Sequence, residues 1–162
     1  MELGRYIEAQ RDFDRACSLE PDPSYLLNAA ELFLTLAMKE RALENVLKAR
    51  QLAGSGDVTN PQGLYYVARM FLKCNEPESA EEAFIAFLQF LQSVIPYTVK
   101  DDSGGHTIRK DGYTIHIVPC IIDFDDLDRL IGAINRAKER KRTTLHINKL
   151  LKKVKAGVLS IK

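Results

Sequence analysis

Small residues recur at a similar spacing along the first half of the chain, and this recurrence limits the possible folds more than any other feature. Ala9, in the opening segment GRYIEAQRDFDRACSLEP, is matched by Ala42, 33 residues further along. Ala16 is matched by Ala49 at the same spacing. A third segment, EPESAEEAFIAFLQFL, places Ala80 in the position of Ala42 after 38 residues, and the extra residues fall in the turn-rich loop GSGDVTN. A period of this length predicts repeated supersecondary units.

Each of the two later segments is preceded by a stretch with apolar residues at helical spacing. These stretches are SYLLNAAELFLTLA and PQGLYYVARMFLK, and in both the apolar residues recur three and four positions apart. We therefore expect each unit to consist of two helices joined by a turn. The alanines would let neighbouring helices approach closely, because the side chains at a helix contact set the distance between the two axes.

This helix–turn–helix unit, with a period of about 34 residues and paired small residues, resembles the tetratricopeptide repeat (TPR) family. Residues 4–21 match the second helix of that motif at Gly4, Tyr6, Ala9, Phe13, Ala16, Leu19 and Pro21. The later copies are looser, because Ala37 and Asn75 replace the turn glycine and Phe87 replaces the second alanine. The resemblance implies a helical solenoid over residues 1–95 whose first repeat is incomplete. Such a start predicts a fragment of a longer repeat protein, with a polar cap at residues 11–14 as the alternative.

The repeat pattern ends at about residue 95, and residues 96–162 are expected to form a C-terminal extension that caps the repeats. HTIRK and YTIHIV are β-branched runs joined by Asp111-Gly112. This pattern predicts a β-hairpin at about residues 106–118 with a type I′ turn. The edge of such a hairpin could also accept an extended peptide by strand addition.

Two helices are expected after the hairpin. The first would be capped by Asp123 or Asp125, with basic residues near its end. The second, LHINKLLKKVKA, would be capped by Thr143 or Thr144 and closed by Gly157. The predicted fold class is therefore mainly α: a TPR-type helical-hairpin solenoid with a C-terminal β-hairpin and two further helices.

We expect neither a catalytic nor a metal-binding arrangement. A hairpin that turns at residues 111–112 places His116 opposite Thr107. The same register places His106 opposite Ile117, so the two histidines need not converge on a zinc ion with Cys120. The run DFDDLD lacks the central glycine and the distal glutamate of a calcium loop, and we interpret it as helix capping. The prediction is a protein without enzyme activity and without a cofactor.

The composition is that of an intracellular protein. No apolar run approaches the roughly 20 residues that span a bilayer, and the N-terminus lacks the basic and then apolar layout of a secretory signal. The three cysteines are an odd number without CxxC spacing, so the sequence predicts no disulfide framework. We expect a cytoplasmic or nuclear location and no membrane partner.

Basic residues gather at the C-terminal end of the chain. Ten basic residues and one glutamate lie between positions 136 and 162, so the rest of the chain is net acidic. Such a cluster would contact the phosphates of a nucleic acid, dock on acidic protein, including the acidic repeats of this chain, or remain a solvated face. The candidate residues, which we call the basic tail, are Arg140, Lys141, Arg142, Lys149, Lys152, Lys153 and Lys155.

The TPR resemblance implies a binding surface as well as a fold. TPR arrays bind protein or peptide partners on a concave surface that is lined by the first helix of each unit. By correspondence with the motif, that surface would comprise Leu27, Asn28, Glu31, Tyr65, Tyr66, Arg69 and Lys73. Tyrosine and arginine dominate binding hot spots, although the two tyrosines could equally serve to cover the core.

We therefore expect a non-catalytic scaffold or adaptor that holds a protein or peptide partner in a larger assembly. The rival hypothesis is a nucleic-acid-associated factor that contacts phosphates through the basic tail.

One TPR subclass clamps the carboxylate tails of heat-shock chaperones, and Asn28 matches its asparagine. Gln62 and Tyr66 stand where that subclass has lysine and arginine, which argues against this ligand. A minor alternative is a type III secretion chaperone, because DPSYLLNAAELFLTLAMKERALENVLKA resembles the repeats of those proteins.

Overall fold

The computed structural model describes residues 3–20, 22–54, 61–100, 102, 106–110, 113–117 and 124–161. It is mainly helical and contains one small antiparallel sheet. The mainly helical character of the predicted fold class is confirmed.

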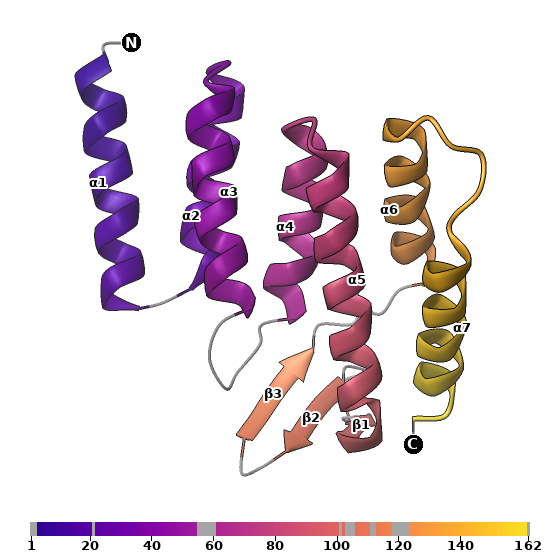
Figure 1. Ribbon diagram of the computed structural model, residues 1–162. Coiled ribbons are helices and arrows are strands. Elements are labelled where there is room, and N and C mark those ends of the chain that lie inside the picture. Colours follow the sequence, from indigo (N-terminus) through magenta and orange to yellow (C-terminus); the bar gives the residue numbers. More distant parts are fainter. Residues whose placement is uncertain are drawn as a thin grey trace.

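The first five helices follow the predicted pairs. They are α1 (Leu3–Leu19), α2 (Pro23–Thr35), α3 (Lys39–Gly54), α4 (Pro61–Lys73) and α5 (Pro77–Val94). α2 and α3 form one helical hairpin and α4 and α5 form the next, while α1 packs on α2, and α3 packs on α4. The hairpins stand side by side in Figure 1. Among the described helices, none is both long and apolar enough to cross a membrane.

Proline is the first residue of α2, α4 and α5, at Pro23, Pro61 and Pro77. This position suits proline because its missing N–H would have no partner within the helix in any case. Asp22 completes the start of α2, since its carboxylate accepts a hydrogen bond of 2.9 Å from the backbone N–H of Ser24.

The turns that close the hairpins use residues other than glycine in the left-handed conformation. Ala37 and Asn75, which replace the glycine of the repeat motif, both have a φ of 58°. At the first turn the backbone N–H of Met38 donates to the carbonyl of Phe33 at 2.8 Å, which satisfies a carbonyl at the end of α2. Glu139, after α6 (Phe124–Ala137), has a φ of 54° and is followed by a hydrogen bond of the same kind. The same turn therefore recurs at the end of α2, α4 and α6.

The alanines that mark the repeat lie at the helix contacts. Ala42, Ala49 and Ala80 are fully buried, which fits the expectation that small residues let the helices approach. Ala9 and Ala16 occupy the same positions in α1 but are only half-buried. Because α1 packs on one side only within the described chain, its residues lose less contact with solvent than their counterparts in α3 and α5.

A small sheet lies between α5 and α6 in the sequence. It follows a 3-10 turn (Ile95–Tyr97) and consists of β1 (Thr98–Lys100), β2 (His106–Lys110) and β3 (Tyr113–Ile117) in the order β1-β2-β3. β2 and β3 pair antiparallel, with His106 opposite Ile117 and Thr107 opposite His116, so the predicted hairpin register is confirmed. β1 was not predicted, and the residues of the expected type I′ turn, 111–112, lie outside the described part of the chain.

α6 continues the row of helices that begins with α2 and α4. It packs on both α4 and α5, as α4 packs on both α2 and α3. Leu127, Leu130, Ile131 and Ile134 form its buried stripe. Because α6 begins at Phe124, Asp125 lies in its first turn and is not its cap, and Asp123 lies outside the described residues.

The last helix, α7 (Leu145–Leu159), packs along α5. Its cap is Thr144, whose hydroxyl accepts a hydrogen bond of 3.4 Å from the backbone N–H of Ile147. The prediction that Gly157 closes this helix is wrong, because the helix continues through it to Leu159. A β-carbon at position 157 would lie 2.8 Å from Cδ1 of Ile95, so the glycine permits close packing of α7 against the 3-10 turn and does not serve as a helix stop.

Candidate functional site

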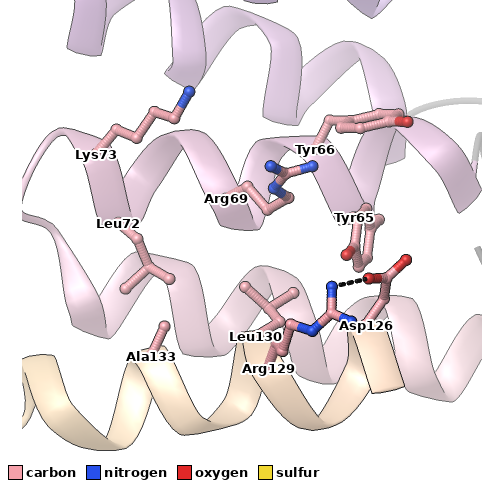
Figure 2. A pocket seen from close by; sticks show the side chains of 9 residues that line it. All are labelled: Tyr65, Tyr66, Arg69, Leu72, Lys73, Asp126, Arg129, Leu130 and Ala133. Atoms are coloured by element: carbon pink, nitrogen blue, oxygen red, sulfur yellow. Dashed lines mark hydrogen bonds and ion pairs between the residues drawn. The ribbon is translucent and has the colours of Figure 1, made fainter. Parts of the chain in front are cut away.

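Two adjoining hollows lie on either side of an exposed row on α4, and we call them together the groove. The first hollow, between α2 and α4, has a volume of about 320 Å³ and is lined from α2 and the buried side of α4 by Ser24, Leu27, Asn28, Glu31 and Met70. The second hollow, between α4 and α6, has a volume of about 430 Å³ and is lined by Tyr65, Leu72, Asp126, Arg129, Leu130 and Ala133 (Figure 2). The row shared by both hollows is Tyr66, Arg69 and Lys73.

The helical periodicity of α4 explains why this row faces outward. Tyr66, Arg69 and Lys73 are separated by three and four residues, so they lie on one face of the helix, and all three are exposed. The opposite face carries apolar residues at the same spacing, among them Val67 and Phe71, and these are buried. One amphipathic helix thus supplies both a core stripe and the centre of the groove.

The two adjacent tyrosines have different roles. Tyr65 is 7% exposed and its ring centroid lies 5.6 Å from that of Phe87, so it belongs mainly to the core. Tyr66 is 41% exposed, and its ring stands edge-on to Tyr65 with centroids 5.5 Å apart. Phe87, which replaces an alanine of the repeat, therefore fills the space beneath Tyr65 and helps to fix the position of Tyr66.

The charged side chains of the groove are mostly paired with each other. Nζ of Lys73 lies 3.0 Å from Oε2 of Glu31, which links α4 to α2. Nη1 of Arg129 lies 3.1 Å from Oδ1 of Asp126, the contact drawn as a dashed line in Figure 2. The guanidinium carbon of Arg69 lies 5.9 Å from the ring centroids of both groove tyrosines. Arg69 makes no hydrogen bond or ion pair with any residue that the structure describes.

The structure places all seven predicted concave-surface residues in this groove. Leu27, Asn28 and Glu31 line its α2 side, and the four predicted residues of α4 line its centre. The contribution of α6 was missed, and it comprises Asp126, Arg129, Leu130 and Ala133. These residues follow a sheet that interrupts the helical pattern, so the repeat spacing contained no signal for their position.

The basic tail does not act as one free cluster. The guanidinium of Arg140 contacts the carboxylate of Glu81 on α5, and Nζ of Lys155 lies 2.7 Å from Oδ1 of Asp128 on α6. Two of the seven candidate residues thus pair within the chain: Arg140 joins the loop after α6 to α5, and Lys155 joins α7 to α6. The other five are exposed and make no ion pair with the described residues: Lys141, Arg142, Lys149, Lys152 and Lys153.

The start of the loop after α6 is tied to α5 by a small ion-pair network. Nζ of Lys138 lies 2.9 Å from a carboxylate oxygen of Glu78 and 3.3 Å from one of Glu81. The hydrogen bond to Glu78 is the largest cause of a raised pKa at Lys138, and burial acts in the opposite direction. Because a raised lysine pKa stabilises the folded state at neutral pH, this contribution is lost only as the pH rises above the ordinary lysine range.

The cysteines of the described chain show no feature of a nucleophile. Cys74 is fully buried, and burial raises the pKa of its thiol, which disfavours the reactive thiolate. Cys17 is half-buried in α1. Within the residues that the structure describes, no group of three or more histidine, cysteine, aspartate or glutamate side chains is arranged to hold a metal ion. Cys120, the candidate zinc ligand of the sequence, lies outside those residues.

Comparisons with protein-family models, with curated proteins and with solved structures return no match for this chain. The function is therefore inferred from the groove itself. The groove is open, and its described lining combines apolar side chains such as Leu27, Leu72 and Leu130 with polar and charged ones.

Proposed function

We propose that this chain is a non-catalytic scaffold or adaptor that holds a protein partner in the groove between α2, α4 and α6. The TPR-type solenoid belongs to the same proposal. It is supported by the recurring helical hairpins, the buried alanines at repeat positions and the shared turn geometry at Ala37 and Asn75.

The observation that carries the proposal is the exposed row on α4. Tyr66 and Arg69 are exposed side by side at the centre of a groove formed by three helices. These residue types dominate the energetics of protein interfaces because they combine a large apolar area with polar groups. The row rests on a fully buried layer that includes Phe87, so a partner would meet an ordered surface and pay little entropy to bind it.

Substitution of Tyr66 by alanine is expected to weaken peptide binding about tenfold or more. Peptides would be selected from a random 12-residue library against the full chain, and their affinity would be measured by fluorescence polarisation. Tyr97 provides a matched control, because it is another exposed tyrosine but lies outside the groove. Equal affinities for Tyr66→Ala and Tyr97→Ala would contradict the proposal.

A second candidate function, binding of a nucleic acid, is supported by the five exposed cations of the basic tail that make no ion pair with the described part of the chain. Lys149, Lys152 and Lys153 lie three and four residues apart on α7, so they share one face of that helix. Arg140 and Lys155 are not counted among these five, because they pair with acidic side chains of the chain.

If the basic tail binds a nucleic acid, the triple substitution of Lys149, Lys152 and Lys153 by glutamine is expected to abolish most of the binding. The slope of log affinity against log salt should then become shallower by about 2–3, because each phosphate contact contributes about 0.9. A labelled RNA and DNA pool would be titrated at several salt concentrations. The matched control removes three exposed arginines from α1, at Arg5, Arg11 and Arg15. Equal slopes for the two triple variants would exclude the tail as the contact.

A further inference from the structure

We propose that the groove binds a peptide segment through an internal aspartate or glutamate whose carboxylate pairs with Arg69. This inference rests on the proposed function, because it specifies the partner's chemistry for the same groove. The evidence for it is the balance of charges among the groove residues and the position of Arg69 between the two hollows of the groove.

Five formally charged side chains of the described residues line the groove, and four of them neutralise each other in pairs. Lys73 is paired with Glu31 at 3.0 Å, and Arg129 is paired with Asp126 at 3.1 Å. Arg69 is the charged lining residue that has no opposite charge among the described residues. The groove therefore has one unmatched positive charge, and a complementary partner supplies one negative charge.

The surroundings of Arg69 favour a carboxylate as that negative charge. The two tyrosine rings, with centroids 5.9 Å from the guanidinium carbon, attract the cation but accept none of its N–H groups in ordinary hydrogen bonds. The planar fork of donors thus stays available to a ligand. A carboxylate engages two of these donors at once, in the bidentate geometry typical of arginine pairs.

The acidic lining residues argue against a nucleic-acid strand in this groove. Glu31 lines the hollow on one side of the α4 row and Asp126 lines the hollow on the other side. A nucleic-acid strand carries a phosphate at every nucleotide, so it would bring phosphates close to both carboxylates. Like charges placed together across an interface reduce affinity. A peptide with a single acidic residue meets Arg69 without this repulsion.

The position of Arg69 also predicts where the acidic residue stands in the segment. Because Arg69 lines both hollows, a segment that fills both must cross the α4 row above it, and the acidic residue is then internal and not the chain end. On either side, the segment also meets apolar side chains of the groove, and residues of the segment that contact them are expected to be apolar. These apolar side chains are those of Leu27, Met70, Leu72, Leu130 and Ala133.

The test is a selection from a phage-displayed random 12-residue library whose peptides are joined to the coat protein at their C-termini, so that no free terminal carboxylate is present. The full chain is expected to enrich aspartate or glutamate at one internal position, with apolar neighbours. The variant Arg69→Glu should enrich lysine or arginine at that position instead. In a synthetic peptide, replacement of the acidic residue by its amide should weaken binding about tenfold or more.

Lys152→Glu is the matched control, because it makes the same change of charge at an exposed residue of α7, outside the groove. It should retain the acidic preference of the original chain. Peptides that depend on Tyr66 but show no acidic position would overturn this inference and leave the proposed function standing. An acidic preference that persists in Arg69→Glu would also overturn it. Failure to select any peptide that depends on Tyr66 would overturn both proposals.

Discussion

Replacement of Phe84 by alanine is expected to lower the free energy of unfolding by about 3–5 kcal/mol. Phe84 is fully buried, and its ring packs on that of Phe87 with centroids 6.4 Å apart. The substitution removes a large apolar side chain and leaves a cavity between helices that cannot close it fully. Since a domain of this kind is stable by only about 5–15 kcal/mol, the loss would be evident as a large shift of the urea midpoint.

Phe13 is the matched control for this substitution. It stands four residues after Ala9, as Phe84 stands four residues after Ala80, so the two phenylalanines hold the same place in the repeat. Phe13 is only half-buried in α1, and its replacement by alanine should cost about 1–2 kcal/mol. Equal losses of unfolding free energy for the two variants would contradict the difference in burial between Phe84 in α5 and Phe13 in α1.

Replacement of Glu81 by glutamine is the second substitution with a large expected effect, a loss of about 3 kcal/mol in the free energy of unfolding. The Glu81 side chain is 14% exposed, and that of Arg140, which contacts it, is 19% exposed. Glutamine keeps the shape but removes the charge, so the mostly buried guanidinium of Arg140 loses its carboxylate partner, while Lys138 keeps Glu78. Urea denaturation followed by circular dichroism would measure the change.

Glu78 provides the control because it contacts the same lysine from the surface. Its side chain is 76% exposed, and exposed ion pairs contribute about 0–1 kcal/mol. Glu78→Gln should therefore leave the urea midpoint nearly unchanged. If Glu81→Gln were equally mild, the loop after α6 would not be held to α5 by this contact, and the placement of α7 would need another explanation.

The helical hairpins could be predicted because their signal is local. Apolar residues at helical spacing and alanines in register define which faces meet, and Ala42, Ala49 and Ala80 are indeed buried. Ala37 and Asn75 could be placed at turns although neither is glycine, because the repeat spacing fixed their positions. The register of β2 and β3 followed from the Asp111-Gly112 dipeptide alone, since the turn of a hairpin sets which residues face each other.

The features that the sequence did not indicate all depend on tertiary placement. β1 has only three residues, too few to show a strand pattern, and it forms by pairing with β2. Gly157 has the local character of a helix stop, but its close contact with Ile95 is long-range. The pairing of Arg140 with Glu81 joins residues far apart in sequence. A count of basic residues therefore overstated the free charge of the tail.

The groove could be predicted from the sequence only in part. Its α2 and α4 residues were predicted from the TPR resemblance, which implies a binding surface on the first helix of each unit. The residues that α6 contributes, among them Asp126 and Arg129, could not be predicted, because α6 follows the sheet in the sequence and does not continue the repeat spacing. The charge balance that leaves Arg69 unmatched becomes visible only with the ion pairs in place.

The most direct test of the groove as a binding site is photo-crosslinking in cells that express the chain. Benzoylphenylalanine would replace Tyr66 at the centre of the groove in one variant and Leu47, which is exposed on α3 outside the groove, in another. The groove account predicts a discrete crosslinked protein with the probe at position 66, its loss on adding Arg69→Glu, and little or no such product at position 47. Equal crosslinking at both positions, or crosslinking at position 47 alone, would contradict it.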